Sequence, residues 1–104
     1  MKKWSPHYFS KVPKDALRLA SELRVLLESE AVDCDFMMRK LFAQFWPEFG
    51  KFWLGAGERV DWVTFALAPH NGEIFVQFVL KEHPEMIAKV ESFLENHRGS
   101  NEQN

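Results

Sequence analysis

Cysteine is nearly absent from this chain, since Cys34 is the only one among 104 residues. A small secreted domain usually carries several cysteines that pair into disulfides, so the sequence predicts a protein of the reducing cytoplasm. No apolar stretch approaches the roughly 18 residues that a transmembrane helix needs, and the residues after Met1 lack the apolar core of a signal peptide. These absences exclude a disulfide scaffold, and they predict no membrane partner.

An excess of charge of one sign is also missing. The net charge of −2 is too weak for an acidic DNA mimic and has the wrong sign for a general nucleic-acid binder. The distribution is uneven, because residues 1–27 hold six Lys or Arg against two acids, whereas residues 28–35 hold four acids and no base. Solvated charge that maintains solubility explains this pattern. The same pattern would also let the basic N-terminus of one protomer contact the acidic turn of another.

Aromatic side chains are what the sequence has in abundance. Ten Phe, four Trp and one Tyr are present, and seven of these rings fall between residues 36 and 53. Each ring brings about 150–250 Å² of surface to bury, and a domain of this size has a limited interior. Either the core is packed with rings, or some rings lie on a surface that meets a partner.

Hydrophobic periodicity predicts three helices. Residues 13–30 place apolar side chains on one face at helical spacing, after a proline suited to the first turn. A second helix begins near Asp33 and breaks or kinks near Trp46, because Pro47 removes a helical hydrogen bond; residues 47–53 can add a short helical turn. The last helix starts at His83-Pro84 and continues to about residue 97.

Residues 59–82 predict a β-hairpin. Asn71-Gly72 is the favoured pair for a two-residue type I′ turn, and it sets the register of the two flanking strands. In that register one face is wholly apolar and packs on the helices, while the other face is mixed and carries Trp62, Phe75 and Val79. The apolar face comprises Val63, Phe65, Leu67, Ile74, Val76, Phe78 and Leu80.

The sequence therefore predicts a single α+β domain with the order α-α-β-β-α. Residues 1–98 form the domain, and residues 99–104 are a flexible polar tail. Residues 4–9 can add a further strand, which must lie at the edge of the sheet because Pro6 has no backbone N–H to donate.

Residues for catalysis or metal binding are sparse. The four histidines lie too far apart in sequence to form a metal motif, and the sequence predicts no cofactor and no enzymatic activity. A small enzyme or ligand-binding domain that uses Cys34 or His70 stays an alternative, because a thiol at a helix N-terminus can be activated and His70 should face Glu73 across the hairpin turn. A second alternative is single-stranded nucleic-acid binding by Trp62 and Phe75 on the sheet face, which the shortage of nearby positive charge disfavours.

Protein binding is the function with positive support, because aromatic side chains outside the helical stripes are numerous. The sequence predicts a non-enzymatic module, of the adaptor, inhibitor, immunity or specialised-chaperone type, that occludes or bridges another protein and forms a homodimer. Pro69 belongs to this site because an exposed X-Pro bond beside a binding tip can exchange between two isomers. The predicted contact residues are Trp46, Phe52, Trp53, Trp62, Pro69, Phe75 and Val79.

Overall fold

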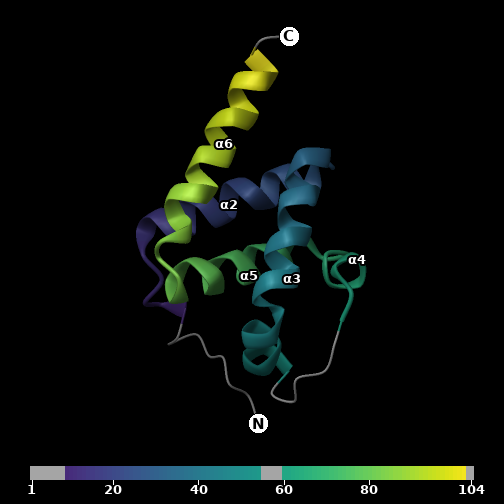
Figure 1. Ribbon diagram of the computed structural model, residues 1–104, viewed down its shortest axis with the longest axis vertical. Helices are drawn as coiled ribbons and strands as arrows, with labels where there is room; N and C mark the ends of the chain where they lie inside the picture. Colours follow the sequence, from purple (N-terminus) through teal and green to yellow (C-terminus); the bar gives the residue numbers. More distant parts are fainter. Residues whose placement is uncertain (1–8, 55–59, 103–104) are drawn as a thin grey trace.

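The structure is a computed structural model that describes residues 9–54 and 60–102. Within these residues the regular structure is entirely helical and no strand is present, so the α+β prediction is wrong. The proposed edge strand lies outside the described residues, apart from Phe9, which is helical. The helices are α2 (Lys14–Glu28), α3 (Val32–Leu54), the single turn α4 (Trp62–Phe65), α5 (Pro69–Glu82) and α6 (Met86–Glu102), arranged as in Figure 1.

The predicted hairpin is replaced by α4 and α5. Ala68 has an extended backbone as the N-cap of α5, and Pro69 occupies the first turn, where its missing N–H costs nothing. The side-chain amide of Asn71 donates a 3.0 Å hydrogen bond to the carbonyl of Phe65, which ties this first turn to α4. Asn71-Gly72 therefore belongs to a helix N-terminus and forms no hairpin turn.

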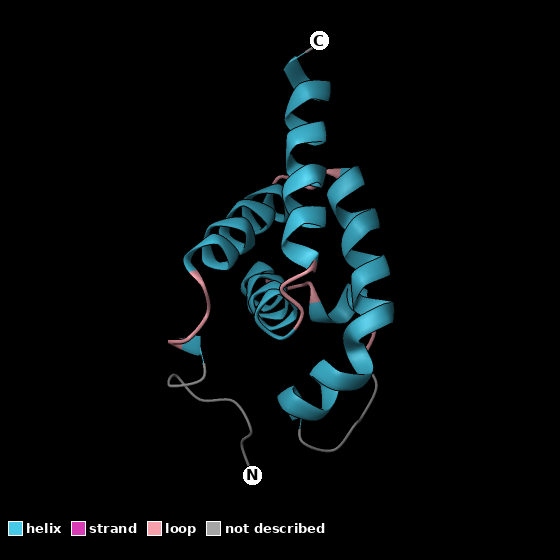
Figure 2. Ribbon diagram, turned by 60° about the vertical axis from the view of Figure 1, so that its left-hand side comes forward, coloured by secondary structure: helices cyan, strands magenta, loops and turns pink. Residues whose placement is uncertain are grey.

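Helix α5 forms the centre of the molecule. Figure 2 shows it nearly end-on, with α2, α3 and α6 around it, and its main packing partner is α2. Gly72 permits this close packing, because a Cβ placed there would lie 2.7 Å from Cδ1 of Leu27. Most of α5 is buried, including Phe75, Val76, Phe78, Val79 and Leu80.

The helix that was predicted to break or kink near Trp46 is kinked. Helix α3 stays helical through Pro47 to Leu54, but its last turns bend away from the axis of the turns before them (Figures 1 and 2). Pro47 and Ala43 are both exposed, so the carbonyl that loses its helical hydrogen bond lies on the solvent side of the helix. The last turns of α3 bring Phe49 into the core, where it is fully buried.

The first and last predicted helices are confirmed. Helix α2 buries Ala16, Leu19, Ala20 and Leu23, while Leu17 and Val25 are exposed, as the helical stripe requires. Helix α6 begins after His83-Pro84 and its backbone stays helical through Gly99 to Glu102, so it extends into the segment that was predicted as a tail. Its C-terminal turns project beyond the other helices (Figure 1).

The core explains most of the aromatic content. Phe49 is the hub of a cluster in which its ring centroid lies 5.2 Å from those of Phe75 and Phe78 and 5.7 Å from that of Phe65. Phe42 extends the cluster with contacts of 5.2 Å to Phe65 and 5.4 Å to Phe75. Phe36 is the single exposed ring among the described residues.

The turn between α2 and α3 is a Schellman motif. The N–H groups of Glu30 and Ala31 donate to the carbonyls of Leu27 and Leu26, both at 3.1 Å. This geometry requires a left-handed residue, and Glu30 adopts it with φ of 62°. Glycine usually occupies that position, because a Cβ is strained there.

Glu30→Gly is accordingly expected to raise the free energy of unfolding by about 0.5–1 kcal/mol. Urea denaturation of the two proteins measures the change. Glu30→Ala is the matched control, because it removes the carboxylate and keeps the strained Cβ, so it should gain nothing. A less stable glycine variant would show that the Glu30 carboxylate itself stabilises the turn.

Candidate functional site

Four of the residues predicted to contact a partner are core residues in this fold. Trp46, Trp62, Phe75 and Val79 are 8%, 6%, 0% and 1% exposed. The exposure predicted for Trp62, Phe75 and Val79 followed from a hairpin face, but these residues lie in α4 and α5. Trp46 was expected at the edge of the apolar stripe of its helix, and the kinked α3 buries it. Trp62 is held in place by a 2.8 Å hydrogen bond from its indole N–H to the carboxylate of Asp35.

The remaining three predicted contact residues are half-buried. Phe52 and Trp53 lie in the last turns of α3, where Phe52 packs 4.9 Å from Phe78 and Trp53 stacks 5.5 Å from Phe49. Pro69 opens α5 and is no exposed hairpin tip, which removes the reason for expecting slow isomer exchange there. No cis peptide bond occurs in residues 9–54 and 60–102.

Cys34 and His70 are placed unfavourably for catalysis. The Cys34 side chain is fully buried, and its Sγ lies 3.8 Å from the carbonyl of Leu23, to which the thiol donates. Burial, with a smaller contribution from the charges of Asp33 and Asp35, raises the pKa of the thiol to about 12. His70 is exposed in the first turn of α5, whereas Glu73 bonds to Arg24 at 3.0 Å. The expected His70–Glu73 pairing across a turn is therefore replaced by an ion pair between α2 and α5.

The thiol of Cys34 is expected to resist modification in the folded protein. A pKa of about 12 leaves only about one thiolate in 10⁵ at pH 7, and burial also blocks the reagent. Absorbance with Ellman's reagent should show almost no reaction until denaturant is added, and then one equivalent. Rapid native labelling would contradict the buried position and restore the alternative of a reactive cysteine.

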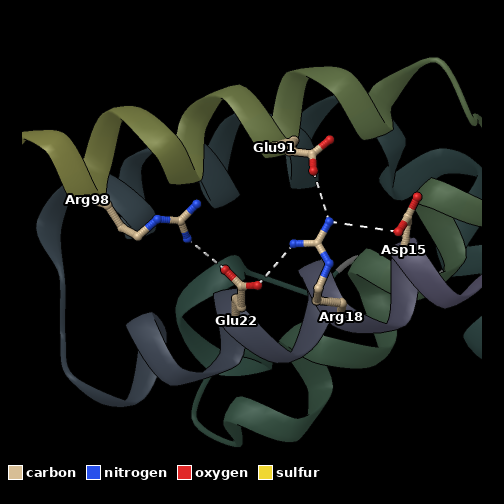
Figure 3. A network of polar contacts seen from close by, with 5 residues as sticks. All are labelled: Asp15, Arg18, Glu22, Glu91 and Arg98. Atoms are coloured by element: carbon tan, nitrogen blue, oxygen red, sulfur yellow. Dashed lines mark hydrogen bonds and ion pairs between the residues drawn. The ribbon is translucent and has the colours of Figure 1, made fainter.

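Polar clusters on the described residues serve mainly to join helices. Figure 3 shows Arg18 on α2 contacting Asp15, Glu22 and Glu91, and Arg98 contacting the other side of Glu22. The two contacts between α2 and α6 are 2.9 Å (Arg18–Glu91) and 3.1 Å (Arg98–Glu22). All five side chains are substantially exposed or half-exposed, so each pair stabilises the docking of α6 only modestly. No set of three or more His, Cys, Asp or Glu side chains that could hold a metal ion occurs in the described part of the chain.

His83 joins the end of α5 to α3. Its Nε2 lies 2.9 Å and 3.0 Å from the two carboxylate oxygens of Glu48, its Nδ1 lies 3.6 Å from Glu85, and its ring packs 4.8 Å from that of Phe45. The hydrogen bond with Glu48 is the main cause that raises the pKa of His83 above its ordinary value near 6.5. The protonated form is therefore favoured by folding.

The stability of the protein is expected to fall as this histidine loses its proton. Its stabilising contribution is complete below the unfolded-state pKa near 6.5 and disappears as the pH rises through the raised pKa of the folded state. Because the pair is partly exposed, we expect a loss below about 1 kcal/mol. Urea denaturation from pH 5.5 to 8.5 measures it, with Glu48→Gln as the control that should flatten this part of the profile. An identical pH dependence in both proteins would contradict the assignment to this pair.

Exposed apolar side chains gather where α3 begins and α4 ends. Among the described residues six large hydrophobic side chains are exposed, and four of them form what we call the α3–α4 face: Val32, Phe36, Val63 and Leu67, at 82%, 59%, 55% and 79%. The Trp62–Asp35 hydrogen bond brings the two elements together, since Phe36 and Val63 directly follow these residues. Val32 and Ala66 line one shallow cavity of about 270 Å³, and Leu67 follows Ala66.

A second groove continues along the same side of α3. It has a volume of about 420 Å³ and lies between α3 and the segment that leads into α4. Its lining includes the largely buried rings of Phe42, Trp46 and Trp62 and the charged side chains of Arg39 and Asp61. Arg39 is held by a 2.7 Å ion pair with Asp35. The groove has the shape and polarity to accept side chains of a protein partner.

The sequence prediction missed most of the α3–α4 face. Val63 and Leu67 were expected on the buried face of the hairpin, and Val32 precedes the helix that was expected to begin near Asp33. Phe36 gave a usable signal, because it points away from the apolar stripe of its helix at 100° per residue. The other three could not be found without knowing that residues 62–65 form a helical turn.

No protein-family model, curated protein or solved structure matches the chain. Its function has to be inferred from its own surface. Among the described helices, none is both long enough and apolar enough to cross a membrane.

Proposed function

We propose that this protein is a non-enzymatic binding module that acts on another protein through the α3–α4 face. The observation that carries the proposal is the exposure of Val32, Phe36, Val63 and Leu67 on two adjoining elements. Burying one such side chain against a partner stabilises the complex by about 1.5–3 kcal/mol, before the costs of association. A cluster of apolar side chains left in water on a small domain is typical of an interaction surface.

Such a module acts by occlusion or bridging, because it covers a surface of its partner and transforms nothing. The described residues offer little to a competing enzymatic function, since the Cys34 thiol stays protonated at neutral pH and the carboxylate of Glu73, expected to face His70, is paired with Arg24. Binding of single-stranded nucleic acid loses its basis, because Trp62 and Phe75 are buried. The cytoplasm remains the proposed compartment, supported by the free thiol of Cys34.

Site-specific photo-crosslinking tests the proposal. The photoreactive residue p-benzoylphenylalanine at position 36 should give a discrete covalent adduct with a protein in extract of the cells that produce this chain. The same residue at position 17 is the matched control, because Leu17 is an exposed apolar residue of α2 outside the face. Phe36→Asp combined with Leu67→Asp should abolish adducts formed from position 63 and leave the thermal melt within a few degrees of the wild type. Equal adducts from positions 36 and 17 would refute the proposal.

A further inference from the structure

The Asn71-Gly72 pair can undergo a reaction within its own chain. The backbone nitrogen of Gly72 can attack the side-chain amide carbon of Asn71. A new N–C bond then closes a succinimide ring, and the side-chain nitrogen leaves as ammonia with the proton that the Gly72 nitrogen gives up. Water opens the ring at either of its carbonyl carbons and leaves aspartate or isoaspartate at position 71. Glycine favours the attack, because it has no Cβ to shield its nitrogen and its backbone rotates freely.

The closed first turn of α5 holds the Asn71 side chain away from that nitrogen. The side-chain amide donates its 3.0 Å hydrogen bond to the carbonyl of Phe65, and the backbone N–H donates to the carbonyl of Ala68 at 2.9 Å. In a helix the N–H of Gly72 is directed back along the axis toward the preceding turn, not toward the side chain of the residue before it. The amide carbon can reach the Gly72 nitrogen only after the bond to Phe65 breaks and the helical backbone rotates.

Packing against α2 adds to this protection. Gly72 is buried, and it lies so close to Leu27 that a Cβ there would come within 2.7 Å of Cδ1 of that leucine. The peptide between Asn71 and Gly72 therefore cannot rotate without separating the start of α5 from α2. The reaction needs the first turn of α5 to open as far as Gly72.

We expect this turn to open without unfolding of the whole protein. The segment that leads into it is exposed at Leu67 and Ala68, and His70 within it is also exposed. Helix α4, to which the turn is tied, is a single turn of four residues. Segments with few buried side chains open at a lower free energy than the core, so the junction of α4 and α5 should open more often than the buried middle of α5.

We propose that Asn71 is a deamidation site that the fold gates. The amide is protected while the first turn of α5 is closed, and it is converted to aspartate or isoaspartate when the turn opens, so the chain carries a permanent record of that opening. This inference is independent of the proposed function, because it needs only water and no partner.

The two products differ in what they do to the junction. Aspartate loses the amide donor to Phe65, but an acidic side chain is favoured in the first turn of a helix. Isoaspartate carries an extra methylene in the main chain, which breaks the hydrogen-bond register of that turn. The isoaspartate form should therefore loosen α4 from α5, together with Val63 and Leu67 of the α3–α4 face.

Incubation of the purified protein at mildly alkaline pH, with and without urea, provides the test. Peptide mapping by mass spectrometry measures the conversion at position 71 and separates the two products. Conversion in the folded protein should be at least about tenfold slower than in urea, because the attack requires a local opening that costs free energy. Isoaspartate should appear among the products, since it forms through the ring and not by direct hydrolysis of the side chain. Asn96, which is followed by a histidine, is the internal control and should stay unconverted on this timescale.

Pro69→Gly tests the role of the turn itself. It removes the ring that fixes the helical backbone at the start of α5, so conversion in the folded protein should rise about two- to fivefold while the rate in urea stays the same. Pro84→Gly, just before α6, is the matched control and should change neither rate. Circular dichroism checks that both variants are folded, and the wild-type comparison decides the question if Pro69→Gly is not.

The outcomes that overturn the proposal are distinct. An unfolded chain that forms no isoaspartate at position 71 overturns the site. Equal rates with and without urea overturn the protection by the fold. A folded Pro69→Gly variant that converts no faster than the wild type overturns the first turn of α5 as the gate.

Discussion

Replacing Phe75 by alanine is expected to lower the free energy of unfolding by about 3–5 kcal/mol, the cost of removing a buried aromatic ring that its neighbours cannot replace. Phe75 is fully buried, and its ring lies 5.2 Å from Phe49 and 5.4 Å from Phe42. Because a domain of this kind is stable by only about 5–15 kcal/mol, the variant should lose a large part of its margin. Urea denaturation followed by far-ultraviolet circular dichroism measures the loss.

Phe36→Ala is the matched control for this experiment. Phe36 is the same residue type and is also helical, but it is 59% exposed, so the substitution should change the stability by about 0.5 kcal/mol or less. The comparison also discriminates between the two folds considered for residues 59–82. In the hairpin Phe75 lies on the open face and its loss is tolerated, so a small effect at both positions would contradict the position of Phe75 in the core.

The helices that the sequence predicted correctly are those at the surface of the bundle. Helices α2 and α6 each bury one face, so their apolar residues recur at helical spacing and their boundaries can be read to within a few residues. Helix α5 gives no such period, because it is buried on most sides. Its run of Ile74, Phe75, Val76, Phe78, Val79 and Leu80 fits a buried helix and a buried strand equally well.

The Asn71-Gly72 pair then led to the wrong prediction of a hairpin for residues 59–82. This pair is a strong hairpin signal when the chain around it is free to turn. Here Asn71 bonds to Phe65, and Gly72 leaves room for the Leu27 side chain to pack closely against α5. Both reasons are tertiary contacts between distant segments, and neither can be read from local sequence. Pro69, the first of the fourteen residues of α5, was the local signal that favoured a helix start.

The candidate site was harder to predict than the fold, because its position depends on which aromatic side chains are buried in the core and which stay exposed. Placing α5 at the centre buries Phe75 and Val79 and brings Trp62 onto Asp35, which leaves Phe36 as the exposed ring of the described chain. The acidic run of residues 28–35 was visible in the sequence, but its position beside the exposed side chains of Val32 and Phe36 was not.

The second large effect is expected at Gly50, which lies inside α3 beneath a tryptophan. A Cβ at this position would lie 2.7 Å from Cε2 and 2.9 Å from Nε1 of Trp46, closer than atoms of a packed core approach. The indole cannot easily move, because it is 8% exposed and packs 4.8 Å from Phe42 and 5.8 Å from Phe49. Alanine normally favours a helix over glycine by about 1 kcal/mol, but overpacking a core costs about 1–3 kcal/mol. We therefore expect Gly50→Ala to destabilise the protein by up to about 2 kcal/mol.

Gly99→Ala is the control that isolates the contact with Trp46. Gly99 also lies within a helix, but a Cβ there would meet nothing within 4 Å, so this substitution should be neutral or should stabilise the protein by up to about 1 kcal/mol. On a Trp46→Leu background, Gly50→Ala should cost less than it does beside the indole, and the difference measures the coupling of the two residues. If Gly50→Ala proved as harmless as Gly99→Ala, the Trp46 ring would have to point away from Gly50 and into solvent, where a binding partner could contact it.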